Sequence, residues 1–467
     1  MLLFGIGLAI SLVMLARSQV AGDALSLLSR GWLLAAEGVW VPFGNPAATS
    51  AGGFLPGGLT ALLVGLPLKI WMDHRAPVVL ILLLHVAAYF LLDRIVAREL
   101  GGRARILLAA VYWLNPWRLY QSAWLDNSNY VFFSGAVHLW ACLRQRRAPS
   151  WIHSTLLVTV VGFTAQLHLD AVILVFAAVL LWRRGYWRPH WGGIALGTLL
   201  TALSLVPFAL EAARRPEILP GGADPIGSNL LRAWPVLKGA AYWLRYASLA
   251  GSEGMNVYDF TPAVGAVADR VLAPLCFGLG RLVALPTMIP ALLANVWLVR
   301  RQLRARRSPR EGRPAGRAWL RGYALWVFVA CLIANALSPT VVMWWHNLIV
   351  LHAAVLPLVL YADVLGRTRL ARHLGRGLAV WIGLSVVLML GMALGAEQYR
   401  HGGREAWSWV LPRNDRVVQD LHLTDHGVSI DPRHGSWPLN NELLYEEFLR
   451  PYELPPPSGA RGSRARP

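Results

Sequence analysis

The sequence predicts an all-α protein that crosses a membrane about eleven times. Of its 467 residues, 56% are hydrophobic and only 15% are charged, whereas soluble domains carry about 25% charged residues. Apolar runs long enough to cross a bilayer recur along the chain, and short arginine clusters separate them. This pattern excludes a single-span receptor, a secreted enzyme and a disordered nucleic-acid-binding tail. The three cysteines lie in apolar runs, without the spacing of a disulfide framework or a metal site.

Twelve apolar runs are candidate spans, and the arginine clusters decide between them. Positive charges near span ends stay in the cytoplasm, and a full span at 58–71 would place the cluster 94–105 on the opposite side from Arg75. The run 58–71 is short and broken by Pro67, which favours an interfacial helix in the first periplasmic loop. Eleven spans remain, with the N-terminus inside and the C-terminus outside, at 1–16, 77–93, 105–120, 128–143, 150–167, 169–182, 191–210, 273–299, 321–338, 345–362 and 377–394.

This topology divides the chain into four parts. They are a transmembrane module over 1–210 with a periplasmic loop at 17–76, a second periplasmic loop at 211–270, C-terminal transmembrane helices over 271–394, and a periplasmic tail over 395–467. The end of the tail, "PPPSGARGSRARP", has a composition typical of disorder. The formal net charge is +19, but the cations stand between apolar runs. We therefore expect membrane lipids, and no nucleic acid, as their partners.

Two aspartates and two basic residues stand where predicted spans meet the outer side. Asp23 and Asp126 each begin a predicted helix, so each is either a helix N-cap or a catalytic carboxylate. Arg118, in "NPWRLY", is either an arginine that snorkels to the interface or a phosphate ligand. His168, in "QLHLD", is either a structural histidine or part of a polar cluster that faces outward. The run "SPTVVMWWHN" lies at another outer boundary between predicted spans. Its tryptophans are either aromatic anchors at the interface or a surface on which a sugar stacks.

Four stretches of the first 210 residues together resemble the GT-C superfamily of membrane glycosyltransferases, in the branch that contains protein O-mannosyltransferases and lipid A aminoarabinose transferases. They are "GDALSLLSRGWLLAAEGVWVPFGNP" with Asp23, "FLPGGLTALLVGLPLKIW", "FLLDRIVARELGGRARILLAAVYWLNPWRLYQSAWLDNSNYVFF" with Asp126, and "VGFTAQLHLDAVIL". The chain departs from this family in two places. Asp23 follows Gly22 instead of a second acidic residue, and "GGFLPGG" stands where a Lys-Pro-Pro stretch is common.

The resemblance implies an enzyme of a bacterial inner membrane that takes a sugar from a polyprenyl-phosphate donor and passes it to a lipid, glycan or protein acceptor on the outer side. It implies that Asp23 is the general base, and that Asp126 orients a cation or joins Asp23 around a divalent metal ion. The residues expected near the donor phosphate are Arg118, His168, Arg214 and Arg215. Those expected to bind the acceptor or the sugar are Trp344, Trp345 and His346.

Two other functions remain open on the sequence. A transporter or flippase of lipid-linked intermediates would carry buried ionisable residues, repeats and broken helices, and the sequence shows no fixed-period repeat. A non-catalytic relative that serves as a scaffold in cell-envelope assembly would keep the architecture and lose acidic residues. The lone Asp23, in place of a pair of acidic residues, favours this alternative. Two aspartates that face one cavity would favour the enzyme, whereas aspartates that only cap their helices would favour the scaffold.

Overall fold

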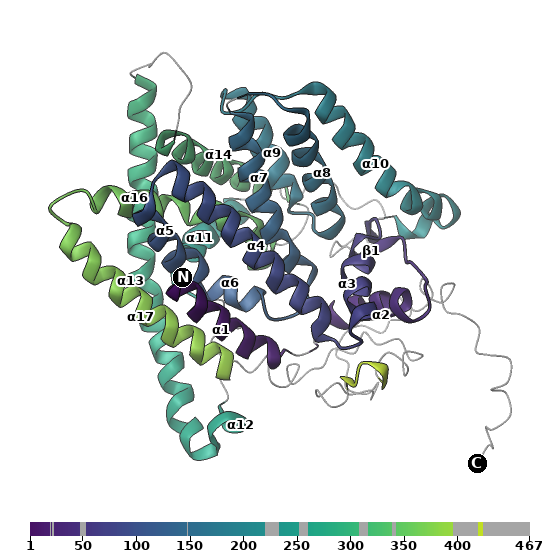
Figure 1. The fold of residues 1–467 in the computed structure, drawn as a ribbon, viewed down its shortest axis with the longest axis horizontal. Helices are drawn as coiled ribbons and strands as arrows, with labels where there is room; N and C mark the ends of the chain where they lie inside the picture. Colours follow the sequence, from purple (N-terminus) through teal and green to yellow (C-terminus); the bar gives the residue numbers. More distant parts are fainter. Residues whose placement is uncertain are drawn as a thin grey trace.

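The described part of the chain is a helical bundle with one small sheet (Figure 1). The computed structural model describes residues 1–18, 20, 23–46, 53–146, 148–219, 233–251, 260–307, 316–338, 342–395 and 419–423. Six helices in these ranges are long and apolar enough to cross a membrane, and four shorter apolar helices accompany them. The prediction of an all-α polytopic membrane protein is confirmed.

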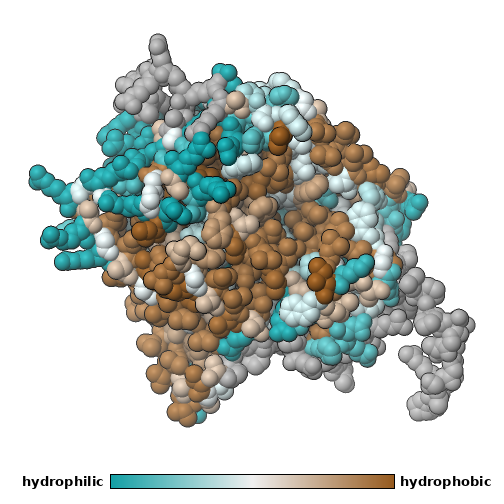
Figure 2. Space-filling model, viewed as in Figure 1, coloured by the Kyte–Doolittle hydropathy of each residue, from teal (hydrophilic) through white to brown (hydrophobic). Residues whose placement is uncertain are grey.

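Each of the eleven predicted spans coincides with a helix or with a run of consecutive helices. In chain order these are α1 (Leu2–Ala16), α4 (Arg75–Glu99), α5 (Gly102–Leu108) with the π-helix η1 (Ala109–Trp113), α7 (Val131–Gln145), α8 (Trp151–Leu167), α9 (Ala171–Arg183), α10 (Trp191–Arg214), α13 (Ala266–Arg307), α14 (Arg317–Ala336), η5 (Trp344–Val350) with α15 (Leu351–Ala354) and α16 (Leu356–Leu365), and α17 (Ala371–Gly395). Figure 2 shows the broad hydrophobic face that these helices present, which suits lipid chains rather than water.

The described residues of the arginine clusters that set the predicted topology lie together at one end of the bundle. They come from 94–105, 144–147, 183–188, 300–321 and 367–376. Contacts that join them are the ion pair Arg146–Glu99, the bond from Arg103 to the Gly366 carbonyl, the bond from Gln302 to the Tyr186 hydroxyl, and the ion pair Arg317–Asp363. Five clusters that are far apart in sequence therefore share one side, as expected if that side is a single membrane face.

The segment between α1 and α4 folds as a small unit of its own, which we call the α2–α3 module. It contains α2 (Asp23–Ala36), the antiparallel strands β1 (Phe43–Pro46) and β2 (Phe54–Pro56), and α3 (Leu59–Ile70). α2 and α3 approach closely at Gly31, where an added Cβ would lie 2.4 Å from Val64. α3 therefore packs mainly on α2, with further contacts to α4 and α8.

The sheet of the α2–α3 module was not predicted from the sequence. The rings of Phe43 and Phe54 pack against each other across the two strands in a tilted arrangement with centroids 4.7 Å apart, and both side chains are buried. These contacts join residues on either side of a Gly- and Pro-rich stretch, so they are invisible to local periodicity.

The segment 211–270 contains a further helix that the sequence analysis treated as part of a polar loop. α11 (Ala233–Tyr246) packs on α14 and buries Trp243 and Tyr246. The flanking residues 220–232 and 252–259 lie outside the described ranges, as does most of the tail. Of that tail, residues 419–423 reach the α2–α3 module, where Trp32 donates a hydrogen bond to Asp420 (2.9 Å). The expected disorder at the end of the tail lies outside the described residues.

Three buried ionisable side chains are hydrogen-bonded to one another in the interior of the bundle. The hydroxyl of Tyr323 lies 2.8 Å from Nδ1 of His138 and 2.9 Å from Nε2 of His352, and all three side chains are at most 2% exposed. The Nδ1–H of His352 donates to the Ile349 carbonyl (2.9 Å). These contacts join α7, α14 and α15, so the histidines are packed and hydrogen-bonded as expected for structural residues.

Candidate functional site

The candidate site lies at the end of the bundle opposite the arginine clusters. α7 begins shortly after Asp126, and α8 ends just before His168. The arginine cluster 144–147 follows in sequence at the end of α7 and precedes the start of α8, so it belongs to the opposite ends of these two helices. A helix as long as α8 spans about 25 Å. The loops that carry Asp126 and His168 are therefore separated from the arginine clusters by the thickness of the bundle.

A break after the π-helix η1 places Arg118 at this end. The side chain of Asn115 accepts hydrogen bonds from the Trp117 and Arg118 amides and so caps α6 (Pro116–Gln121), which has proline at its first position. The same side chain donates to the carbonyls of Val111 (3.0 Å) and Tyr246 (2.8 Å). α6 is thereby fixed to both η1 and α11, and the guanidinium that it carries has a defined position.

Arg118 is fully buried and forms no ion pair with a described Asp or Glu residue. It donates to the Trp113 carbonyl (3.0 Å) and to the hydroxyls of Ser11 (2.9 Å) and Ser122 (3.3 Å), and it lies 4.0 Å from the centre of the Trp113 ring. Its Nη2 has no hydrogen-bond partner in the part of the chain that the structure describes. Of the two alternatives for this arginine, snorkelling to the interface does not agree with its complete burial.

Other buried polar atoms without partners surround this guanidinium. The amide of Gln121, one turn along α6, has no partner at either atom, and the same holds for the hydroxyl of Tyr112. The Nε2–H of His85 donates to the Asn129 carbonyl (3.0 Å), while its Nδ1 is unpartnered. Buried polar groups are normally satisfied by water, an ion or a ligand. The unpartnered Nη2 of Arg118, the Gln121 amide nitrogen and the Tyr112 hydroxyl can all donate, so this group is chemically suited to an anion.

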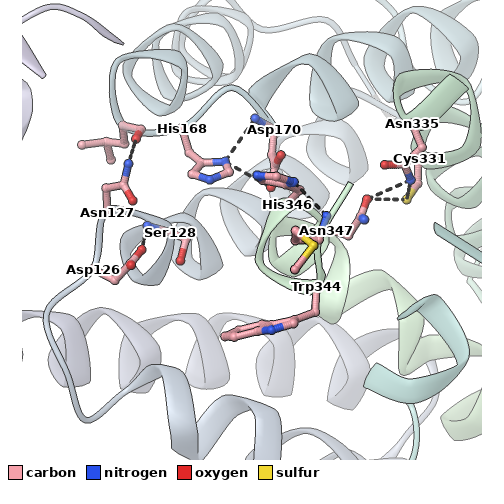
Figure 3. A network of polar contacts seen from close by, with 12 residues as sticks. Asp126, Asn127, Ser128, His168, Asp170, Cys331, Asn335, Trp344, His346 and Asn347 are labelled. Atoms are coloured by element: carbon pink, nitrogen blue, oxygen red, sulfur yellow. Dashed lines mark hydrogen bonds and ion pairs between the residues drawn. The ribbon is translucent and has the colours of Figure 1, made fainter. Parts of the chain in front are cut away.

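Asp126 caps the short helix that follows it. Its Oδ1 accepts a hydrogen bond from the Ser128 amide (2.7 Å) at the start of the 3₁₀-helix η2 (Asn127–Tyr130). The next residue, Asn127, donates to the Leu167 carbonyl (2.8 Å) at the end of α8. The Asp126 turn is therefore joined to the turn that carries His168 (Figure 3).

His168 forms a buried pair with an aspartate two residues away. Its Nδ1 lies 3.1 Å from Oδ2 of Asp170, and the two residues are each 8% exposed. Asp170 stands in the turn before α9. The QLHLD motif therefore yields an interacting histidine and aspartate rather than an isolated histidine.

The segment at the start of η5 joins α6 to the His168 turn. The centre of the Trp344 ring lies 5.6 Å from that of Trp117 in α6. The Trp345 ring packs edge-on against Trp344, with centroids 5.1 Å apart. The His346 ring lies 5.8 Å from that of His168 (Figure 3). Residues that are 178 and 227 positions apart in the sequence thus meet, as a binding site at this end would require.

The structure places the two remaining cations at the edge of the α2–α3 module. Arg214 is exposed at the last position of α10, and Arg215 pairs with Glu211 (2.6 Å). Ala212 and Ile218 on either side of them join the hydrophobic cluster of that module. These arginines do not belong to the group around α6.

Asp23 is the first residue of α2, at the start of a helix as predicted. Its side chain lies outside the described part of the structure. The next residue, Ala24, belongs to the same hydrophobic cluster as Leu125 and Tyr130, which flank the Asp126 turn. The first turn of α2 is therefore part of the apolar cluster that supports the candidate site.

The described residues do not assemble a metal site. No three His, Cys, Asp or Glu side chains among them are placed to hold one ion. In addition, Oδ1 of Asp126 already accepts the bond that caps η2, and Nδ1 of His168 already faces Asp170. With the side chain of Asp23 undescribed, the donor set seen does not fit a divalent ion.

Three polar residues of this region were missed or left unassigned by sequence reasoning. Asn115 holds α6, Gln121 lies beside Arg118, and Asp170 pairs with His168. Asn115 could have been found, because asparagine followed by proline is a strong helix-start signal. The role of Gln121 depends on tertiary burial that no local pattern reveals, whereas Asp170 stands two residues from His168 in the polar cluster QLHLD and could have been assigned to it.

Comparison with known proteins supports the fold. No protein family model matches the chain, and no curated protein matches it by sequence. The crystal structure of ArnT from Cupriavidus metallidurans in the apo state matches with a TM-score of 0.55 and 12% identity, over 94% of this chain and 89% of ArnT. The structure of the same protein bound to undecaprenyl phosphate matches with a TM-score of 0.52 and 16% identity, over 96% of this chain and 88% of ArnT.

The resemblance inferred from the first 210 residues is therefore confirmed at the level of the fold and extends over most of the chain. ArnT stands in the lipid A aminoarabinose transferase branch to which those residues pointed. The chain therefore shares the polytopic helical fold of ArnT over most of its length.

Proposed function

We propose that this protein is a glycosyltransferase that moves a sugar from a polyprenyl-phosphate donor to an acceptor hydroxyl on the extracytoplasmic side of a bacterial inner membrane. The observation that carries the proposal is a fully buried arginine without a carboxylate partner among the described residues, set in the fold of a protein that binds undecaprenyl phosphate. A buried cation without a counter-ion is costly. An anionic ligand would offset that cost.

The donor phosphate would lie beside Arg118. Its unpartnered Nη2 can donate to a phosphate oxygen, and the Gln121 amide and the Tyr112 hydroxyl offer further donors. As the bond between the anomeric carbon and the phosphate oxygen breaks, negative charge accumulates on the lipid phosphate. Fixed donors that face this charge lower the barrier, because they need no reorganisation when it develops.

The acceptor hydroxyl would approach from the other side of the sugar. Its oxygen attacks the anomeric carbon while its proton passes to a carboxylate, for which we propose Asp23. The new bond forms opposite the one that breaks, so the configuration at the anomeric carbon inverts. Trp344, Trp345 and His346 lie next to α6 and would hold the sugar or the acceptor by ring stacking and hydrogen bonding.

The arginine clusters give the proposed orientation. If the end that carries them faces the cytoplasm, the candidate site faces outward, the N-terminus is inside and the C-terminus is outside. Arg214 and Arg215, at the edge of the α2–α3 module, would then meet the donor as it approaches from the outer leaflet. A divalent ion between Asp23 and Asp126 is not needed for any of these steps.

Transfer in proteoliposomes tests the proposal. The parent is supplied with a panel of synthetic polyprenyl-phosphate sugars, and Asp23→Asn is compared with Glu217→Gln, an exposed acidic residue outside the site. We expect the parent and Glu217→Gln to turn over one donor, and Asp23→Asn to keep donor binding and lose turnover. Unchanged turnover in Asp23→Asn would remove it as the base. Loss of turnover with a chelator, restored by one divalent ion, would establish the metal that the described residues do not provide.

One observation favours the scaffold function instead. The Oδ1 of Asp126 caps η2, which is the structural role expected if this residue does no chemistry. A scaffold would neither bind undecaprenyl phosphate nor turn over any donor in the panel. The same proteoliposomes therefore distinguish the two functions.

A further inference from the structure

The His168–Asp170 pair contains a proton whose position the geometry constrains. The Nδ1 of His168 lies 3.1 Å from Oδ2 of Asp170 and 3.3 Å from the Asp170 amide nitrogen. If Nδ1 carries no proton, it accepts a long bond from that amide, and its lone pair faces a carboxylate oxygen. If Nδ1 is protonated, it donates a charge-assisted bond to Oδ2, which is stronger. The short approach to the carboxylate favours the protonated ring.

Burial strengthens this preference. Oδ2 of Asp170 accepts no hydrogen bond from a described residue, and the ionisable group that lies close to it is the His168 ring, at 3.1 Å. An ionised carboxylate in such a place needs a positive partner, because an unpaired buried charge costs several kcal/mol. A neutral His168 would leave Asp170 without one, whereas an imidazolium makes the pair neutral overall.

The groups that face the pair do not supply an alternative cation. His346 from η5 lies 5.8 Å from the His168 ring, between ring centres. Tyr246 from α11 and Cys331 from α14 lie close enough to Asp170 to interact with it electrostatically, and each is neutral or negative. The Asp126 turn, which is attached to the end of α8 through Asn127, adds a negative group. Among the residues that the structure describes, the positive charge near Asp170 therefore has to come from a histidine.

We infer that Asp170 is a positioning residue that holds His168 as an imidazolium, so that His168 supplies a proton-dependent positive charge to the phosphate of the lipid donor. The inference rests on the proposed function, because it assigns a partner to a residue of the same site. Donor binding should then weaken as the pH rises through the pKa of His168.

The sign of the effect follows from the charge of the histidine. A carboxylate partner stabilises the imidazolium and keeps it charged above the ordinary histidine pKa of about 6.5. Asp170→Asn removes that partner, so His168 becomes neutral at a lower pH. The second ionisation of the lipid phosphate, near pH 6 for phosphate esters, is common to all variants and cancels in the comparison.

The test measures binding of undecaprenyl phosphate to the full chain in nanodiscs between about pH 5.5 and 8.5, a range that spans histidine titration. We expect Asp170→Asn to bind about tenfold more weakly than the parent near pH 8, the loss of about one charge-assisted bond, and to recover near pH 5.5. Asp170→Glu should keep much of the parent profile, and Glu217→Gln all of it. Equal weakening of Asp170→Asn at every pH would show a structural role only and overturn the inference.

A second measurement does not depend on the folding of that variant. In the parent, ¹⁵N spectra of the histidine rings, with His168→Asn used to assign the signal, report the protonation state directly. A doubly protonated His168 near pH 7.5, above its ordinary pKa, supports the inference, and a neutral ring overturns it. If the parent itself binds no undecaprenyl phosphate, the proposed function fails, which is a different result from an altered pH profile.

Discussion

Replacing Arg118 with methionine should separate a binding role of this residue from a structural one. The guanidinium is fully buried, and two of its three acceptors are serine hydroxyls that already donate their own protons, Ser11 to the Gly7 carbonyl (2.7 Å) and Ser122 to the Leu119 carbonyl (2.9 Å). Methionine has a similar length and no charge. The substitution therefore leaves no buried donor unsatisfied at these serines.

The expected change in stability is small because two large terms oppose each other. Three hydrogen bonds from a charged donor are lost, each of about 1.5–3 kcal/mol. The desolvation penalty of a buried ion, several kcal/mol, is removed with them. We expect the free energy of unfolding to change by no more than about 2 kcal/mol. The affinity for a lipid phosphate loses one charge-assisted bond, also about 1.5–3 kcal/mol, which corresponds to about 10- to 150-fold.

Undecaprenyl phosphate binding in nanodiscs and thermal unfolding in detergent measure the two quantities. Arg146→Met is the matched control, because Arg146 is also buried but pairs with Glu99 at the opposite end of the bundle. We expect Arg146→Met to lower stability and to leave the affinity of the folded protein unchanged. An Arg118→Met protein that unfolds far more easily and binds undecaprenyl phosphate as the parent does would refute the reasoning and make Arg118 a structural residue.

Two substitutions test the packing that supports the site. Asn115→Ala removes the cap of α6, about 1 kcal/mol, and two buried donor bonds of about 1 kcal/mol each, so thermal unfolding should show a destabilisation of about 3 kcal/mol. Asn115→Ser should recover the cap. Equal losses in the two variants would contradict the separate contribution of the cap. Gly135→Ala places a Cβ 2.4 Å from Nδ1 of His352 and should cost about 1–3 kcal/mol by overpacking. Gly5→Ala, which meets nothing within 4 Å, should not destabilise, and a similar loss there would show a general helix effect.

The spans could be predicted because two independent signals agree in this sequence. Apolar runs mark the helices, and the arginine clusters remove the one run, 58–71, that does not cross. The structure gives that run a 12-residue helix packed on α2. What local patterns could not give is the hairpin of Phe43 and Phe54 or the burial of α11, since both depend on partners far away in sequence.

The candidate site was predictable to the extent that topology places residues. Asp126, His168 and His346 each stand at the same ends of predicted spans, so their convergence follows from counting crossings. The environment of each side chain was not predictable. Arg118 is buried instead of snorkelling because Asn115 breaks the helix before it, and Arg215 is paired with Glu211 at the edge of the α2–α3 module.

Asp126 offers the sharpest distinction between an enzyme and a scaffold, because its cap and its charge can be removed separately. Asparagine caps helices about as well as aspartate, so Asp126→Asn should keep the bond from the Ser128 amide and unfold at the temperature of the parent. If the carboxylate orients a cation at the donor phosphate, turnover should fall at least about tenfold, the loss of one charge-assisted contact. Asp126→Ala should lose both turnover and stability. Full turnover in Asp126→Asn, with losses confined to Asp126→Ala, would mean that this aspartate only begins a helix, and the chemistry would have to be carried by Asp23 without it.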